Sequence, residues 1–570
     1  MGNGMDKVLD QYTDAKNFIP GGSFSTQQNE QSRFDNLVNR ASVKWRQQVD
    51  SAHFMTLNLY GLTGYNKKDE ASLSESYRNA ILENRLQNNI NNKGNKTEAG
   101  GDFTWMQKRK GNWPLLNAVL QGSYRNQNSR DFWRNRTVYE DPIQEVRDEQ
   151  YRNYTGTNTY GSATLSAVRA LGKGYFLECS SGAGLASEKT HRQQGPLDMP
   201  EVITDSLSPE FSRSVLSLTN GITLKRNQKA LRWNIALQRK DLWLNPVLSK
   251  QSLYNKHYGY VLPSAFMEKE LGKGSRLHFV YNTSVTAPTA AQLMPVADYS
   301  NPLMLTKGNA FLKPEYRHTA NASYFLFNQF SMSSFSASLR GDYTHNNIAY
   351  SRTVLPNLAQ QLQLVNTPYE WSSALTLNYS KPVNSIGLSI HAGITESWAQ
   401  SISPVNNTDN KNNTLSHQLD LSFSNIKSDV WDLRWGGNIN ISDSRYSINK
   451  EMNNRYYNYS GFAQISYRPV AQWSIGASGD ITYYTAQSFD QPVTVPILSA
   501  EITRYLFASQ RGAISIRAFD LLDRNKAVQR TSQLNYLMEQ RSNTIGRYLM
   551  LSFSYRLNKA GNPNSISIQR

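Results

Sequence analysis

Residues 547–557, RYLMLSFSYRL, alternate between apolar and polar side chains along their whole length. One face of this stretch carries Leu549, Leu551, Phe553, Tyr555 and Leu557. The opposite face carries Met550, Ser552, Ser554 and Arg556. Because successive side chains of a strand point to opposite faces, this period of two predicts a β-strand with one apolar and one polar side.

Similar alternating stretches recur along the chain, and we expect roughly 20–22 of them. Short Gly- or Pro-containing turns alternate with long polar segments, whereas a soluble sandwich would space its turns evenly. A closed barrel also removes the open strand edges that lipid cannot tolerate. We therefore predict an all-β fold, a transmembrane antiparallel up-and-down β-barrel with short periplasmic turns and long extracellular loops, closed by residues 547–557 against the first strand.

The composition suits a membrane barrel and not a bundle of membrane helices. Hydrophobic residues make up 39% of the chain and the mean hydropathy is −0.59. No run of 18 apolar residues occurs, but only alternate residues of a barrel strand need to face lipid. Aromatic residues are abundant, and Trp473 and Tyr483 end one apolar strand face about 33 Å apart, near the distance between two membrane interfaces.

The net charge of +17 is dispersed along the chain and not gathered into a basic tract. No recognised nucleic-acid module accompanies it, so we expect no nucleic-acid partner. A lumen or rim that attracts anions, or loops that meet anionic lipid, explains the charge better. Cys179 is the single cysteine, which excludes an intramolecular disulfide and a cysteine zinc site.

The chain divides into three parts. Residues 1–40 are polar without a sustained period, and we predict a polar N-terminal segment or incomplete first strands. Residues 41–557 form the predicted outer-membrane barrel, and residues 558–570 form a polar C-terminal tail. Within the barrel, the polar segments 65–97 and 125–155 are predicted to be long exposed loops.

The sequence LGKG occurs twice, at 171–174 and at 271–274, each time between two alternating stretches. Glycine adopts positive φ angles readily, so both copies predict tight hairpin turns. The spacing of a phosphate-binding loop is missing, and a strand instead of a helix is expected to follow.

Residues 279–316 read FVYNTSVTAPTAAQLMPVADYSNPLMLTKGNAFLKPEY and carry a combined motif. Its elements are Pro-[Ser/Thr]-x-x-Gln-Leu, Asn-Pro-Leu and Gly-Asn-x-x-Leu-x-Pro-Glu. The residues that match are Pro288, Thr289, Gln292, Leu293, Asn301, Pro302, Leu303, Gly308, Asn309, Leu312, Pro314 and Glu315. This pattern resembles the barrel portion of Bacteroidetes-type TonB-dependent receptors, an outer membrane β-barrel family. The endings FDLLDRNK at 519–526 and GRYLMLSFSYRLNK at 546–559 are similar to that family too.

The resemblance covers the barrel from about residue 150 to 559. It implies the Gram-negative outer membrane, contact with its lipid, and uptake of a solute through the barrel. It also implies a TonB complex acting through a plug domain, and the sequence leaves open whether a surface lipoprotein lies on the outer loops. Neither a plug nor a secretion signal is found in this sequence, so we expect a removed signal or the later part of a longer protein.

The motif segment, which we call the signature loop, has two interpretations. The preferred one is a shaped connection that sets the register of the barrel: Gly308 and Asn309 can form a tight turn, and Pro314 stiffens the return into the next strand. The alternative is a ligand-facing surface.

No catalytic pattern is found, and we predict that the protein is not an enzyme. The eight histidines are scattered, and neither an HExxH nor a GxSxG motif is present. Residues 409–413, DNKNN, lack the glycine and the final glutamate of a calcium loop. We therefore predict no catalytic residue, no metal site and no cofactor.

The leading functional hypothesis is the translocation barrel of a transporter resembling TonB-dependent receptors, with a loop-based binding surface for an unidentified solute. A plug-less porin or structural outer-membrane protein is the first alternative. A soluble all-β adhesin or glycan binder is the second. An outer-membrane hydrolase is the third, and the missing nucleophile motif disfavours it.

Overall fold

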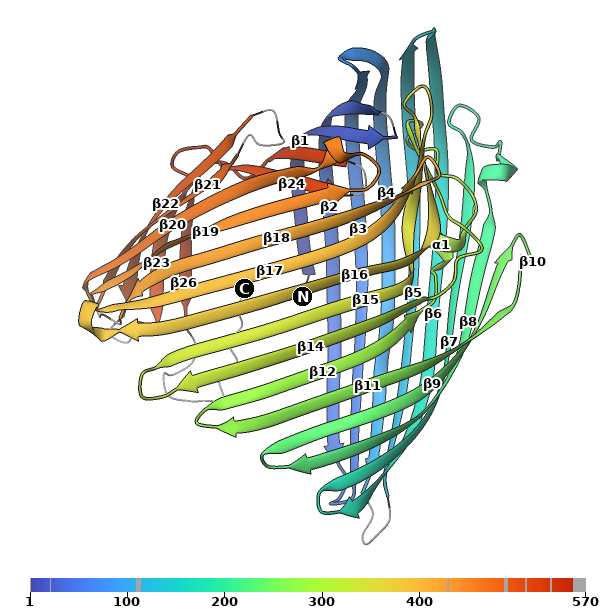
Figure 1. Ribbon diagram of the computed structural model, residues 1–570. Helices are drawn as coiled ribbons and strands as arrows, with labels where there is room; N and C mark the ends of the chain where they lie inside the picture. The colour runs from blue at the N-terminus through green and yellow to red at the C-terminus, as the bar shows by residue number, and fades with distance from the viewer. Residues whose placement is uncertain are drawn as a thin grey trace.

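The computed structural model describes residues 2–20, 22–108, 114–426, 428, 430–485, 489, 491–507, 510–533 and 536–556. These residues form a single sheet of 26 strands, one short α-helix and three 3-10 helices (Figure 1). Among them, no helix combines the length and the apolar character needed to cross a bilayer.

The first half of the sheet comprises β1 (Gly2–Ile19), β2 (Gly22–Gln48), β3 (His53–Arg78), β4 (Ile81–Gln107), β5 (Leu115–Glu140), β6 (Ile143–Gly172), β7 (Tyr175–Pro196), β8 (Glu210–Gln228), β9 (Leu231–Leu248), β10 (Gln251–Ser252), β11 (Lys256–Gly272) and β12 (Ser275–Thr286). The second half comprises β13 (Met304–Lys307), β14 (Glu315–Asn328), β15 (Ser333–Val354), β16 (Gln360–Val383), β17 (Leu388–Val405), β18 (Thr408–Asn425), β19 (Trp431–Tyr446), β20 (Asn454–Val470), β21 (Trp473–Tyr484), β22 (Val493–Leu506), β23 (Gly512–Phe519), β24 (Lys526–Gln533), β25 (Tyr536–Asn543) and β26 (Tyr548–Tyr555). The helical segments are η1 (Asp205–Leu207), α1 (Ala290–Leu293), η2 (Asn384–Ile386) and η3 (Lys450–Met452).

The strands form an antiparallel meander in which each long strand pairs with the next one along the chain. The short strands β10 and β13 lie in connections at one end, and the pairs β23–β24 and β25–β26 each make one pass along the wall. When β10 and β13 are left out and each of these pairs counts once, the 26 strands make 22 passes along the wall. This number agrees with the roughly 20–22 strands expected. The all-β barrel prediction is therefore confirmed.

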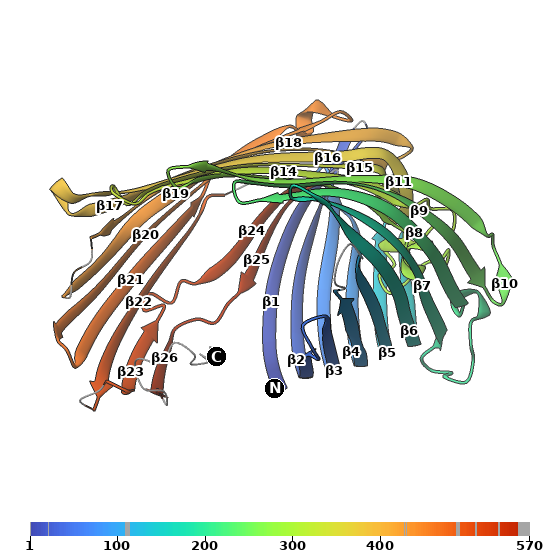
Figure 2. The ribbon, with the colours of Figure 1, turned by 90° about the horizontal axis from the view of Figure 1, so that it is seen from below.

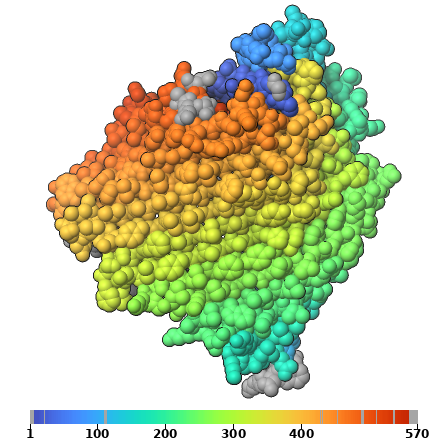
Figure 3. Space-filling model, in the orientation of Figure 1, coloured from blue at the N-terminus to red at the C-terminus, as the bar shows by residue number. Residues whose placement is uncertain are grey.

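The last strand carries its predicted apolar residues, where they are described, as exposed side chains. The side chains of Leu549, Leu551 and Phe553 are 74%, 73% and 64% exposed on the outside of the sheet. Ser552, on the other face, shares a hydrogen bond with Ser515 of β23 at 2.7 Å. Figure 3 shows one side of this outer surface, formed mostly by the strands coloured green to orange. Leu557, the last residue of the expected apolar face, lies outside the described residues.

The prediction of long loops at 65–97 and 125–155 is wrong. Both segments are strands, which continue as the hairpins β3–β4 and β5–β6 and turn at Asn79–Ala80 and Asp141–Pro142. These hairpins rise above the rest of the barrel (Figures 1 and 3). Their upper halves lack an apolar outer face because they extend past the apolar band, and a strand with two polar faces shows no alternation to read.

Residues 2–40 are strand as well, apart from the turn that joins β1 to β2. This segment carries polar residues on both faces, which explains why its sequence shows no sustained period. The expected polar tail, residues 558–570, lies outside the described residues.

The expected pairing of the last strand with the first is wrong. β26 pairs with β23, whereas β1 pairs with β25 over Gln11–Asn17. Figure 2 shows β24 and β25 beside β1, with β23 and β26 farther from it. Asp520 and Asp523 have positive φ angles and accept hydrogen bonds from backbone amides of residues 524, 525 and 547. These bonds replace ladder pairing there, so the β24–β25 hairpin bends away from β23 and β26.

Candidate functional site

The signature loop, residues 287–314, lies inside the barrel. It follows β12, forms α1 and β13, and returns into β14. On one side Leu293 and Leu312 are fully buried in a cluster with Phe211 of β8 and Leu244 of β9. On the other side β13 forms a parallel ladder with β16. The same segment also forms hydrogen bonds with β4 and β5. A segment that reaches strands on such different parts of the wall must lie in the interior of the barrel (Figure 2).

The start of the loop is fixed by a capped helical turn. Thr289 and Gln292 form a reciprocal capping box at the N-terminus of α1. Glu188 of β7 accepts a hydrogen bond from the Ala290 amide at 2.6 Å and pairs with Arg213 of β8 at 2.8 Å. A partly buried wall carboxylate therefore holds α1 against β7 and β8.

The Gly308–Asn309 pair fixes the second half of the loop. A Cβ atom on Gly308 would lie 2.4 Å from the Met294 carbonyl oxygen and 2.6 Å from that of Gln292, so only glycine fits. The Asn309 side chain donates a hydrogen bond to the Leu364 carbonyl of β16 at 3.0 Å, and its amide donates to the Gln292 carbonyl at 2.8 Å. These contacts close the loop on itself and tie it to β16.

The remaining signature residues also contact the loop or the adjacent strands. Asn301 accepts a hydrogen bond from the Leu303 amide at 3.0 Å, beside the partly buried Pro302. Glu315 accepts one from the Ile348 amide of β15 at 2.8 Å, and Pro288 and Pro314 are buried. These contacts suit a shaped connection, while Gly308 also borders the cavity described below. The functional role of the signature residues stays a prediction.

The structure does not bring the closing-strand residues into this site. Leu549, Leu551, Phe553 and Tyr555 lie on the exposed face of β26, away from the loop. The connection 355–359 does join the site, because Ala359 and Leu303 pack on Leu86 of β4.

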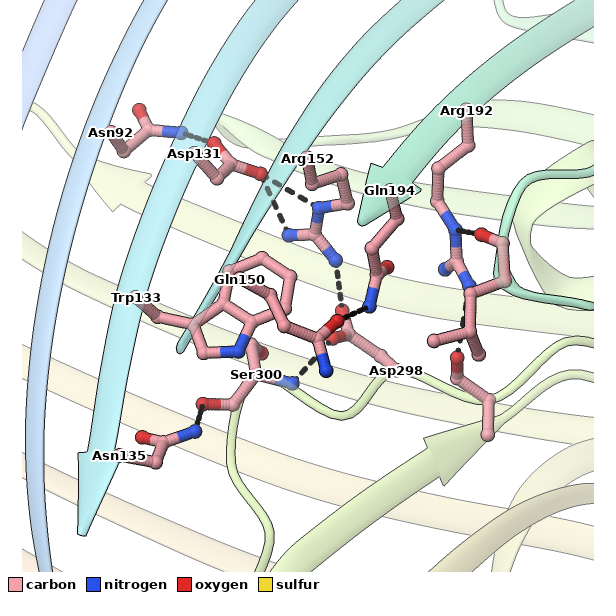
Figure 4. A network of polar contacts seen from close by, with 12 residues as sticks. Asn92, Asp131, Trp133, Asn135, Gln150, Arg152, Arg192, Gln194, Asp298 and Ser300 are labelled. Carbon is pink, nitrogen blue, oxygen red and sulfur yellow. Dashed lines mark hydrogen bonds and ion pairs between the residues drawn. The ribbon is translucent and has the colours of Figure 1, made fainter. Parts of the chain in front are cut away.

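A polar network links the loop to the wall (Figure 4). Arg152 of β6 forms ion pairs of 2.8 Å with Asp131 of β5 and with Asp298 of the loop. The Ser300 carbonyl accepts hydrogen bonds from Asn88 of β4 at 3.3 Å and from Asn135 of β5 at 3.2 Å. One guanidinium thus joins two carboxylates that lie on opposite sides of the contact between loop and wall.

The charges of this network stabilise each other. Burial by itself would raise the pKa of the Asp298 carboxyl, but Arg152 and a hydrogen bond from Ser300 outweigh it and hold that pKa below its usual value. Burial would likewise lower the pKa of Arg152, yet the charges of Asp298 and Asp131 raise it. The Asp298 carboxylate and the Arg152 guanidinium therefore each favour the charged form of the other.

A cavity of about 410 Å³ lies beside this network, between the loop and the upper wall. Its lining comprises Asn92, Ser129, Asp131, Arg152, Tyr154, Arg192, Ala291, Met294, Val296, Asp298, Thr306, Lys307, Gly308, Tyr350 and Leu364. The strands that contribute, β4 to β7 and β15 to β16, stand on both sides of the loop.

Arg192 of β7 is the most isolated charge in this lining. It is only 3% exposed, and it donates hydrogen bonds to the backbone carbonyls of Leu207 at 2.5 Å and Ala297 at 3.1 Å. Burial, together with the nearby charge of Arg152, lowers the pKa of Arg192 to about 10. No carboxylate among the described residues forms an ion pair with it.

Sequence reasoning missed Asp131, Arg152, Arg192 and Asp298, because the first two fall in a segment interpreted as a loop. A signal was present: Ser129, Asp131, Trp133 and Asn135 recur every second residue and share the inner face of β5. Within the described ranges, no three His, Cys, Asp or Glu side chains gather in a way that could hold a metal ion.

An antiparallel barrel with an exposed apolar outer band and a polar interior that holds a loop defines an outer-membrane β-barrel protein. The profile of the outer membrane protein β-barrel family matches residues 244–555. The chain belongs to this family, which resides in the Gram-negative outer membrane and is non-enzymatic. No curated protein matches the sequence.

Several solved structures share the barrel architecture at low identity. The siderophore receptor PirA from Pseudomonas aeruginosa is 11% identical with a TM-score of 0.36, over 96% of this chain and 81% of that chain. The copper transporter OprC is 10% identical with a TM-score of 0.43, over 96% and 81%. The unliganded ferric citrate transporter FecA is 10% identical with a TM-score of 0.44, over 95% and 79%. These similarities are too distant to transfer a ligand, and the Bacteroidetes type of receptor stays a prediction.

Proposed function

We propose that this chain is the translocation barrel of a transporter resembling TonB-dependent receptors, and that it takes up an unidentified solute. The signature loop restricts the outer half of the lumen and offers the binding surface. The observation that carries this proposal is the position of the loop, which spans the interior from β16 to β4 and β5.

Three further features support this role. Besides its apolar anchor on β8 and β9 and the β13–β16 ladder, the loop is attached at polar points such as Arg152–Asp298 and Glu188–Ala290, which can be released without unfolding a strand of the wall. A polar cavity lies directly beside it. The motif of residues 288–315 resembles that of TonB-dependent receptors, which supports coupling to a TonB complex through a plug domain and contact with a surface lipoprotein.

Two alternative functions, a soluble adhesin and a plug-less porin, have different outcomes. The soluble adhesin is wrong, because the apolar strand faces lie exposed on the outside of an outer-membrane barrel. A plug-less porin that passes solutes passively remains the competing proposal, and it differs in one measurable way. It conducts ions with the signature loop in place.

The test measures single-channel conductance in planar bilayers with potassium chloride. Asp298 and Thr306 are bridged, with the Asp298 amide 2.8 Å from the Thr306 carbonyl oxygen. Residues 299–305 can therefore be replaced by Asn-Gly, which forms a tight turn between paired residues. We expect a low conductance for the parent and a several-fold higher conductance for the shortened loop.

A matched control keeps the loop length and changes only its freedom. In a Cys179→Ser background, cysteines at Leu305 and Gln361 should form a disulfide, because these residues are Cα partners in the ladder between β13 and β16 and neighbouring strands lie about 4.8 Å apart. Oxidation should hold the conductance low and reduction should restore the parent value. A parent barrel that conducts freely, with no change when the loop is shortened, would favour the porin and reject the gated pathway.

A further inference from the structure

Among the described residues, Arg192 and Arg352 are the two buried arginines without a carboxylate partner, and of these only Arg192 lines the cavity. Arg152, Arg213 and Arg530 each pair with at least one carboxylate, at 2.8, 2.8 and 2.5 Å. Arg192 has two backbone carbonyls and no such partner among the described residues. A buried charge without a counter-charge is strongly unfavourable, so the charge of Arg192 calls for an anion.

The cavity next to Arg192 is arranged to receive that anion. Arg192 and Lys307 both line it, and the structure records no ion pair for Lys307. The acidic residues of the lining, Asp131 and Asp298, are already bound to Arg152. The five charged residues of the lining, three cations and two carboxylates, sum to +1, and neither Arg192 nor Lys307 forms an ion pair with a carboxylate of the described residues.

Neutral donors complete the lining. Tyr154 and Thr306 also line the cavity, and no hydrogen bond is recorded for either hydroxyl in the described part of the chain. Hydrogen bonds from a guanidinium and an ammonium to an oxyanion are short and about twice as strong as neutral ones. The volume of about 410 Å³ falls within the range of small-molecule sites.

We propose that this cavity binds an oxyanion, the carboxylate or phosphate group of a small solute, between Arg192 and Lys307. Arg192 offers two or more N–H donors in a planar fork that suits either group. The inference deepens the proposed function, because the anionic group would belong to the transported solute. The binding event itself can be measured without transport.

The experiment titrates the purified barrel in detergent with citrate and, separately, with inorganic phosphate, while chloride keeps the ionic strength constant. Binding is followed by isothermal titration calorimetry. The variants are Arg192→Gln, Arg192→Lys and Arg352→Gln. Arg352 is the matched control, because it is 7% exposed, pairs with Asn17 instead of a carboxylate, and lies outside the cavity.

We expect saturable binding of at least one of the two anions to the parent and to Arg352→Gln. Arg192→Gln should weaken it at least tenfold, and Arg192→Lys should recover part of the loss because the charge returns. A stronger response to citrate than to phosphate, or the reverse, assigns the carboxylate or the phosphate. Equal binding by the parent and Arg192→Gln, or no binding of either anion, would overturn the proposal.

The two proposals fail separately. If the barrel binds an anion but its conductance does not depend on the loop, the proposed oxyanion site stands and gated transport is rejected. A gated barrel that binds neither anion would keep transport and reject the anionic solute.

Discussion

Replacing Arg152 by glutamine should loosen the signature loop. Arg152 is the one guanidinium that contacts both a wall carboxylate, Asp131, and a loop carboxylate, Asp298, at 2.8 Å each. Glutamine keeps a polar side chain of similar reach but removes the positive charge. The Asp131 side chain, 7% exposed, would then remain as a buried anion for as long as the loop is docked.

The magnitude follows from how deeply each pair is buried. Removing one partner of a buried ion pair costs roughly 3–5 kcal/mol. The Asp298 side chain is 35% exposed, so its own share falls toward the 0–1 kcal/mol typical of surface pairs. When the loop undocks, water reaches Asp131 and relieves part of the free-energy cost of burying this side chain without Arg152. We therefore expect loop opening to become about 2–3 kcal/mol easier, roughly 30- to 150-fold.

Hydrogen exchange of the loop amides measures this opening directly. Suitable probes are the Asp298 amide, bonded to the Thr306 carbonyl at 2.8 Å, and the Gln360 amide, bonded to the Leu303 carbonyl at 2.8 Å. Both should exchange faster in Arg152→Gln by the factor above, while the amides of the barrel strands keep their rates.

A matched control uses the same substitution at an exposed ion pair. The Arg340 side chain of β15 is 59% exposed and bonds to Asp342 at 2.7 Å, so Arg340→Gln should change loop exchange less than threefold. Adding Asp131→Asn to Arg152→Gln should restore part of the protection, because the uncompensated charge is gone. Loop exchange within threefold of the parent in Arg152→Gln would show that this network does not hold the loop.

Three further outcomes are expected. Leu551→Arg should cost about 2–4 kcal/mol in unfolding from liposomes if that residue lies near the middle of the bilayer, while Ser552→Arg on the inner face should cost under about 1 kcal/mol. Glu396 and His417 share a hydrogen bond on the outer face among exposed apolar neighbours of β17 and β18, so His417→Leu should cost roughly 1–3 kcal/mol by leaving Glu396 without its partner, and the double leucine variant should stay within about 1 kcal/mol of the parent. The pKa of Asp298 lies below its usual value, so its contribution is present at neutral pH and is lost as the pH falls below about 4; exchange of the loop amides, corrected for intrinsic rates, should rise there in the parent and less in Asp298→Asn.

Part of the candidate site was within reach of the sequence. The motif of residues 288–315 marked the loop, because its glycine, asparagine and prolines serve local turns that are encoded locally. Its destination was not predictable, because Gly308 is required by a contact with the Met294 carbonyl that forms only when the loop folds back. The partners of Asp298 were also hidden, since Arg152 lies 146 residues away along the chain.

The errors in the fold share one physical cause. Alternation reveals a strand only where its two faces meet different surroundings, and the tall hairpins β3–β4 and β5–β6 have polar faces on both sides above the apolar band. The prediction that the last strand pairs with the first was wrong for another reason. Asp520 and Asp523 interrupt the last two passes with side-chain hydrogen bonds to the backbone, and no periodicity announces such a break.

The sequence alone determined that this chain is a membrane β-barrel with an apolar exterior, because the direction of each side chain follows from its own position in a strand. Only the tertiary structure decided that the signature loop turns inward, that Arg152 joins Asp131 to Asp298, and that Arg192 lines the cavity without an ion pair to any described carboxylate. Those contacts depend on how the sheet curves and closes. Curvature brings together strands that are distant in the chain, and this is a property of the whole sheet and not of any one segment.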